Sequence, residues 1–161
     1  SGSCSIATRA QVAHHAATHP CQEINAVDVI EGRVTAQDMA TWALNAEGIP
    51  LIYSSADPEV VTQVQKKFGQ AQSSAALEGF FATIAALAID AGATRIITAG
   101  GETSGAVIEH LDLGTLEIGP EIDAGVPALR ARDDLVVALK SGNFGAVDFF
   151  AKAAGVLAGT A

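Results

Sequence analysis

The stretch from residue 95 to residue 105, RIITA followed by GGETSG, decides the fold of this chain. Arg95–Ala99 contains two isoleucines and a threonine, β-branched residues that favour a strand. This strand runs directly into the glycine-rich turn Gly100–Gly105, after which a helix is expected from about Ala106 to Leu111. A strand, a glycine turn and a helix in succession form the repeating unit of an α/β protein.

Two similar units lie on either side of this stretch. Pro50–Ser54 (PLIYS) is a compact apolar run typical of buried parallel strands, and Asp57-Pro58 predicts that a helix follows. Leu135–Leu139 predicts another strand, which ends in the turn Lys140–Gly145 (KSGNFG) ahead of a final helix. The sequence therefore predicts several parallel strands joined by helices.

A third glycine-bearing turn, Ser1–Ser5 (SGSCS), opens the chain and leads into a helix expected from about Ala7 to His19. Such a turn normally follows a strand in an α/β protein, and no apolar run stands before Ser1. We therefore expect the chain to be a fragment of a longer one.

The remaining elements complete a single domain over residues 1–161. Strands are expected at Cys21–Val27 and Leu116–Ile122, and the capping pattern at Thr35 predicts a helix that reaches Glu47. Ser73–Ala91 is apolar on nearly all sides, which predicts a central helix buried against the sheet. Gly119–Pro127 resembles a linker. We expect a three-layer α/β/α domain with a mainly parallel sheet and glycine-rich strand-to-helix turns at one edge.

Composition and charge exclude several classes of protein. A formal net charge of -9 leaves no basic face for nucleic acid. No apolar run approaches the roughly 20 residues that span a bilayer, and no signal peptide is recognisable, so we expect a cytoplasmic protein without a membrane partner. The two cysteines, Cys4 and Cys21, do not form a disulfide framework or a CxxC motif.

The three turns together predict an anion-binding edge. Each precedes a helix, where backbone N–H groups and the helix dipole attract phosphate, and the carboxyl ends of parallel strands share one edge of a sheet. Taken singly, each turn is as well explained by tight backbone geometry, because glycine also allows positive φ and close packing. Neither the P-loop pattern nor GxGxxG is present.

Several side chains near these turns have two interpretations. Thr103 and Ser104 are placed either to donate to phosphate or to cap the following helix, and Glu102 either orients a metal-bound water or is a solvated acid. Lys140 is either a point charge for a polyphosphate or a strand-end lysine. The pair His15 and His19 has a zinc-like spacing without the glutamate of HExxH, which favours an exposed helix surface.

Longer motifs resemble one family. SGSCSIATRAQV (1–12), TAGGETSGAV (98–107), LEIGPEIDAGVPALR (116–130) and LVVALKSGNFGAVDFF (135–150) are similar to the C-terminal domain of the four-carbon acid sugar kinases. The resemblance covers nearly the whole chain, with the motifs in the same order. It implies a kinase that phosphorylates the 4-hydroxyl of a four-carbon acid sugar, 3-oxo-tetronate or a related threonate or erythronate.

The resemblance also implies how such a kinase divides its work. An N-terminal domain, which this chain lacks, would hold the acid sugar and supply the acidic catalytic residue, so no catalytic residue is assigned here. The C-terminal domain would bind ATP or ADP, with Mg²⁺ between the phosphates. The implied nucleotide contacts are Ser3, Gly100, Gly101, Glu102, Thr103 and Gly142; the choice between Ser1 and Ser3 stays open.

Two alternatives from other classes remain. The same turns suit a non-catalytic nucleotide- or anion-binding module, and the α/β pattern alone suits a flavin or dinucleotide redox domain, although GxGxxG is missing. The sequence leaves a homo-oligomer open.

Overall fold

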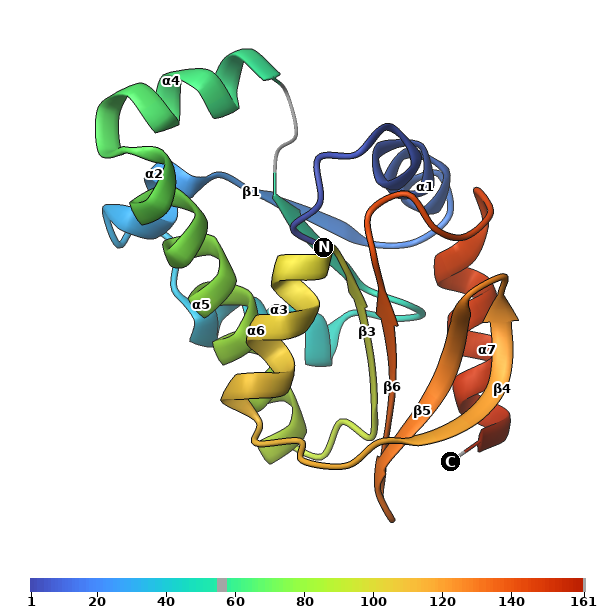
Figure 1. The fold of residues 1–161 in the computed structure, drawn as a ribbon. Helices are drawn as coiled ribbons and strands as arrows, with labels where there is room; N and C mark the ends of the chain where they lie inside the picture. The colour runs from blue at the N-terminus through green and yellow to red at the C-terminus, as the bar shows by residue number, and fades with distance from the viewer. Residues whose placement is uncertain (55–57, 161) are drawn as a thin grey trace.

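A computed structural model of the chain describes residues 1–54 and 58–160. The strands β1 (Cys21–Ile24) and β2 (Leu51–Ser54) form a parallel pair. A second sheet has the order β3-β6-β5-β4, and Figure 1 shows it curving beside the first. Its members are β3 (Arg95–Ala99), β6 (Leu135–Lys140), β5 (Val126–Arg132) and β4 (Glu117–Asp123).

The second sheet is mixed. β3 and β6 are parallel, whereas β5 is antiparallel to both of its neighbours, β6 and β4. β3, β6 and β4 thus share one direction, as expected of a mainly parallel sheet. The linker predicted at Gly119–Pro127 is wrong, because this segment is a β-hairpin whose turn contains Gly125 at φ +76°. Register shifts beside Glu121 accommodate Pro127, a residue that sequence patterns associate with loops.

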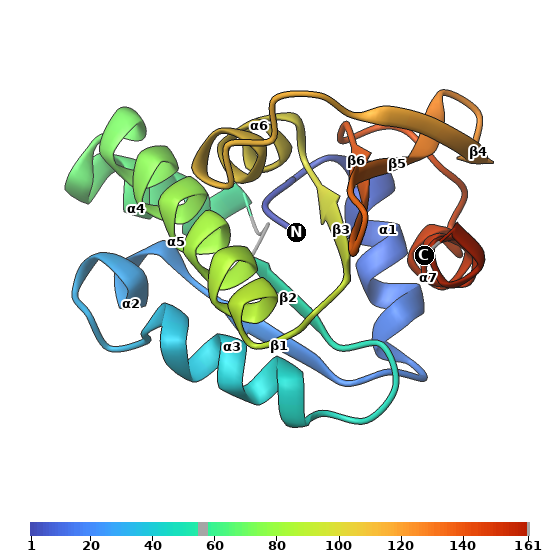
Figure 2. The same ribbon diagram turned by 90° about the horizontal axis from the view of Figure 1, so that it is seen from below.

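Helices cover the sheets on two sides, which confirms the α/β class and the three layers. Figure 2 shows α1 and α7 on one side, with α3, α5 and α6 on the other. The seven helices of the described residues are α1 (Ile6–Ala16), α2 (Ala26–Ile30), α3 (Ala36–Asn45), α4 (Pro58–Phe68), α5 (Gln70–Asp90), α6 (Gly101–His110) and α7 (Phe149–Thr160). Asp57, where the sequence predicted a helix start, lies outside the described residues.

The apolar core is divided between these two sides. One cluster places Phe149, Phe150 and Leu157 of α7 against Ala99 and Ala138 of the central strands. A second cluster places three aromatic and aliphatic side chains of α5 against β1 and β2; they are Phe80, Phe81 and Ile84. Contrary to the expectation that no apolar run is long enough, α5 could cross a bilayer by length and composition alone. It nevertheless packs against α3 and α6 as a core helix does.

Two element boundaries differ from the sequence expectation. α6 begins at Gly101 and not at Ala106, because Gly100 alone, at φ +123°, reverses the chain. β1 ends at Ile24, where Asn25 caps α2 by accepting a hydrogen bond from the Asp28 N–H at 2.9 Å. The strand predicted to reach Val27 is therefore shorter.

Candidate functional site at the carboxyl edge of the central strands

The three glycine-bearing turns meet at one edge of the sheet (Figure 1). β3 and β6 are parallel and end side by side, so the chain leaves both at the same edge. There the Gly100 N–H donates to the Lys140 carbonyl at 2.8 Å, and the Gly2 N–H donates to the Ala99 carbonyl at 3.0 Å. Segments separated by 97 and by 40 residues are thus joined by backbone hydrogen bonds. The structure brings together the turns at which all six predicted site residues lie.

Close packing explains three of the glycines in these turns. A Cβ on Gly100 would lie 3.2 Å from the Ser3 nitrogen, and one on Gly142 would lie 2.8 Å from Ser3 Oγ. Real Cβ atoms rarely tolerate such approaches, so Ser3 touches both of the other turns. A Cβ on Gly2 would likewise meet Thr103 Oγ1 at 2.2 Å. Ser3 thus lies between the second and third turns.

The carbonyl of Gly142 is the centre of a polar network. It accepts hydrogen bonds from Ser5 Oγ at 2.5 Å, Thr8 Oγ1 at 2.7 Å and Lys140 Nζ at 3.0 Å. Ser5 is also the N-cap of α1, because its side chain accepts from the Thr8 N–H at 3.1 Å. One serine therefore fixes both the start of α1 and the position of the third turn.

Lys140 is fully buried beneath this network. Its ammonium donates to Thr8 Oγ1 at 2.9 Å and to the carbonyls of Ser141 and Gly142 at 3.0 Å, which uses all three of its N–H donors. No ion pair involves it within residues 1–54 and 58–160. Burial lowers the pKa of Lys140 to about 8. The site therefore has a buried positive charge without a countercharge, and neither sequence interpretation of this lysine had placed it inside the fold.

The N-terminus of α6 offers free backbone donors. Its N-cap is Gly100, which has no side chain to accept from the first N–H groups of the helix. Gly101 and Glu102 are exposed, and a Cβ on Gly101 would meet nothing within 4 Å. This helix end thus has open space in front of it, as an anion requires.

Thr103 and Ser104 do not cap the helix, which was one of their two interpretations from the sequence. Both are buried within α6, and neither caps it. Ser104 Oγ lies 2.7 Å from Thr98 Oγ1, a bond that ties the helix to β3. Thr103 Oγ1 lies under the first turn, close to where side chains on Gly2 and Gly100 would stand. The hydroxyl of Ser104 is therefore structural, whereas Thr103 borders the site.

Sequence reasoning missed Gln11. Its Nε2 donates to the carbonyls of Phe144, Gly145 and Ala146 at 2.9–3.0 Å, and its Oε1 is buried without a partner in the described part of the chain. Gln11 thereby fixes the end of the third turn against α1. Nothing in the local sequence signals this contact, because more than 130 residues separate the partners.

The paired histidines are not an exposed surface, contrary to expectation. His15 is 3% exposed, and its Nε2 lies 2.8 Å from the Ile49 carbonyl. It stacks on His19 with ring centroids 4.5 Å apart. Burial lowers the pKa of His15. His15 is a core residue, and the described residues contain no cluster of metal-ligating side chains around it.

The fold and the site together define the class of this protein. It is an α/β domain in which the N-termini of α1 and α6 and three glycine-bearing turns lie at one edge of the sheet. Comparison with known proteins then gives the family. The chain belongs to the family of nucleotide-binding C-terminal domains, whose model matches residues 1–150.

Curated relatives of this chain are named 3-oxo-tetronate kinase. The protein from Pseudomonas savastanoi pv. phaseolicola is 44% identical over 163 aligned positions, covering 99% of this chain and 38% of the relative. The protein from Haemophilus influenzae is 38% identical, covering 97% of this chain and 39% of the relative. The chain therefore spans less than half the length of the curated relatives it matches.

Solved structures agree with the fold. A crystal structure of a Haemophilus influenzae protein superposes with a TM-score of 0.90 at 36% identity, covering 97% of this chain and 39% of that one. A Bordetella bronchiseptica protein superposes with a TM-score of 0.76 at 19% identity, covering 96% of this chain and 39% of that one, which shows the fold alone.

Proposed function

We propose that this chain is the ATP-binding domain of a kinase that phosphorylates the 4-hydroxyl of a four-carbon acid sugar such as 3-oxo-tetronate. One observation carries the proposal: the uncapped N-terminus of α6 opens beside the first and third turns, above the buried charge of Lys140. The family and the names of the relatives support the nucleotide and the reaction.

In this proposal the phosphates of ATP or ADP lie across the three turns. The N–H groups at Gly101, Glu102 and Thr103 donate to phosphate oxygens, since these are the first groups of a helix without a side-chain cap. Ser3 and Gly142 border the same space. Lys140 contributes through its charge alone, because its own donors are already used within the protein.

The residues present fit a nucleotide better than they fit a metal ion. Among the described residues no group of three or more His, Cys, Asp or Glu side chains gathers to hold a cation. Mg²⁺ usually binds through one or two carboxylates together with substrate phosphates. Mg²⁺ would accordingly rest chiefly on the phosphate oxygens, with the exposed Glu102 placed to orient a water molecule of its shell.

The rest of the reaction is assigned to a second domain. ATP supplies the phosphoryl group, and the acid sugar and the acidic catalytic residue belong to the part of the relatives that this chain does not cover. Positioning and charge neutralisation would do most of the catalytic work. We place the kinase in the cytoplasm, where ATP and small sugar acids are available.

Calorimetric titration with Mg-ADP tests the nucleotide site. Gly101→Val should lower affinity about tenfold or more, because the new side chain enters the open space before the helix. Gly105→Val is the matched control: it makes the same substitution on the same helix, also toward open space, and should leave affinity unchanged.

Two outcomes would contradict the proposal. Equal affinity for Mg-ADP in Gly101→Val and in the unaltered protein would remove the nucleotide from the α6 N-terminus. Binding of pyrophosphate as tight as that of Mg-ADP, without phosphoryl transfer by the longer protein, would favour a non-catalytic anion-binding module.

A further inference from the structure

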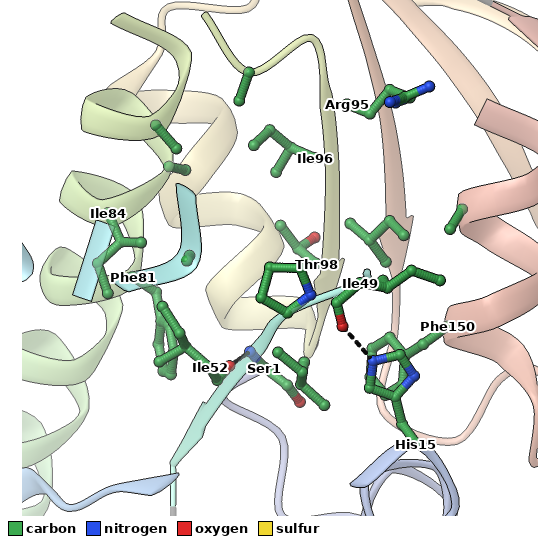
Figure 3. Close-up of a pocket in the computed structure, with 18 of the residues that line it drawn as sticks. Ser1, His15, Ile49, Ile52, Phe81, Ile84, Arg95, Ile96, Thr98 and Phe150 are labelled. Atoms are coloured by element: carbon green, nitrogen blue, oxygen red, sulfur yellow. Dashed lines mark hydrogen bonds between the residues drawn. The ribbon is translucent and has the colours of Figure 1, made fainter. Parts of the chain in front are cut away.

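A cavity of about 660 Å³ separates the two sheets. β2 borders it through Leu51 and Ile52, and β3 borders it through Ile96, Ile97 and Thr98. Figure 3 shows Ser1 at one end of this space, with side chains from both strands and from helices on either side pointing into it. Within the described residues the only strand paired with β2 is β1, and the only strand paired with β3 is β6. Both strands therefore present an edge to the cavity.

Ser1 and Gly2 are already paired as residues of a central parallel strand. The Ser1 nitrogen donates to the Ile52 carbonyl at 2.7 Å, and the Ser54 N–H donates to the Ser1 carbonyl at 3.0 Å. These two bonds place Ser1 opposite Tyr53 in a parallel ladder. The Gly2 N–H turns the other way and donates to the Ala99 carbonyl at 3.0 Å. Alternation between two neighbours is the pattern of a strand with a partner on each side.

The same alternation leaves backbone groups of β3 directed at the cavity. The Thr94 carbonyl accepts from Val136, and the Gly100 N–H donates to Lys140, so even-numbered residues of this segment face β6. Odd-numbered residues face the other way, as the bond from Gly2 to Ala99 shows. The N–H groups of Ile97 and Ala99 thus point away from β6, toward the side on which the cavity lies, where an apolar filling would leave them unpaired at a cost.

We propose that the cavity is the position of a further β-strand, parallel to β2 and β3 and formed by the residues that precede Ser1 in a longer chain. Continuity with Ser1 selects this occupant, and the relatives are long enough to contain it. Because Ser1 already lies opposite Tyr53, the register back to Pro50 allows about three residues upstream of Ser1, at roughly 3.3 Å each. The strand would join both sheets into one, in the order β1, β2, new strand, β3, β6, β5, β4.

The lining of the cavity specifies the chemistry of this strand. On one face lie Phe81, Ile84 and Ala88 of α5, and on the other lie Phe150 and Ala154 of α7. A strand between two apolar layers must be apolar on both faces, as central parallel strands are. Burial lowers the pKa of the Ser1 amino group to about 5, which fits a position better suited to a neutral peptide N–H than to a charge.

Amide hydrogen exchange tests this inference without reference to nucleotide. Residues 1–161 would be compared with a form that carries the natural residues upstream of Ser1. In the longer form the amides of Ile97 and Ala99 should exchange at least tenfold more slowly. The amides of Ile96 and Thr98, which face β6, provide the internal control and should be protected in both forms. Equal exchange of Ile97 and Ala99 in the two forms would overturn the proposal, whether or not nucleotide binds.

A cavity-filling substitution gives a second, independent measurement. Ala88→Leu should raise the Tm of residues 1–161 by a few degrees, because it fills empty space, and lower the Tm of the longer form, because it overpacks the inserted strand. Ala86→Leu, on the same helix but outside the lining, should shift both forms alike. A rise in Tm for Ala88→Leu in both forms would show that the cavity stays empty and would refute the strand.

Discussion

Lys140 carries a charge that the fold keeps from water and from carboxylates in the described residues. Burial alone lowers its pKa to about 8, since the neutral form is easier to hold inside a protein. A phosphate bound at the adjacent turns would favour the ammonium form and raise this pKa again. Nucleotide binding and protonation of Lys140 should therefore be coupled.

This coupling predicts how affinity depends on pH. Below about pH 8 the lysine is already protonated in the free protein, so affinity for Mg-ADP should be constant there. Above pH 8 binding must take up a proton, and affinity should fall by at most about tenfold per pH unit. Calorimetry between pH 7 and 9.5 in two buffers of different ionisation enthalpy measures both quantities. Nucleotide phosphates, with a second pKa of about 6, do not titrate in this window.

Lys140→Met supplies the control for this prediction. Methionine has a similar length and no charge, so the variant should bind Mg-ADP more weakly and lose the decline above pH 8. If the variant retains the decline, another group is responsible for it.

At the scale of elements, the start of α1 and the third turn depend on the same side chain. Ser5→Ala removes the N-cap of α1 and the bond to the Gly142 carbonyl together. The loss of a cap costs about 1 kcal/mol, and the additional bond raises the expected total to about 2 kcal/mol. Urea denaturation measures the change, and affinity for Mg-ADP should fall as well because the third turn is released.

Thr35→Ala separates these two effects. Thr35 caps α3 by accepting from the Asp38 N–H at 3.1 Å, and α3 packs against α5 and β2. This variant should lose about 1 kcal/mol of stability and keep its affinity for Mg-ADP. A comparable loss of affinity in both variants would mean that Ser5 acts only through overall stability.

Local patterns predicted elements where the signal is contained in a few residues. RIITA gave β3 with its bounds, and Thr35 marked the start of α3. They failed where pairing decides the structure: β5 was missed, because Pro127 and Gly125 resemble a loop until β6 is placed beside them. The start of α6 was misplaced because Gly100 alone makes the turn.

In the candidate site, too, some features could be predicted from local sequence and others could not. The three turns were found from their glycines, and the structure confirms that they meet. Gln11 and the burial of Lys140 could not be found, because both depend on contacts across more than 130 residues. Binding at the predicted residues stays a prediction until nucleotide affinity is measured.

At the scale of the whole molecule, this chain should bind nucleotide without completing a reaction. The relatives are more than twice as long, and a substrate hydroxyl must be held in line with the transferred phosphoryl group. Residues 1–161 should therefore show no release of ADP dependent on a four-carbon acid sugar, whereas the longer protein should. A coupled assay for ADP checks this, and turnover by residues 1–161 alone would refute the division between two domains.

Closure of the longer protein is a further expectation, since ATP and acid sugar would lie on different domains and the phosphoryl group must be shielded from water. Small-angle scattering should report a smaller radius of gyration when both ligands are present. Identical profiles with and without ligands would contradict closure.

The bonds from Gly2 to Ala99 and from Gly100 to Lys140 determine when a newly synthesised chain becomes able to bind nucleotide. Residues that stand at the beginning, middle and end of the sequence must be adjacent before any anion can be held, so loops of about 40 and 100 residues must close first. A nascent or partly unfolded chain should therefore not bind nucleotide. Ligand in the cell would then stabilise only finished molecules and would spare them selectively from proteolysis.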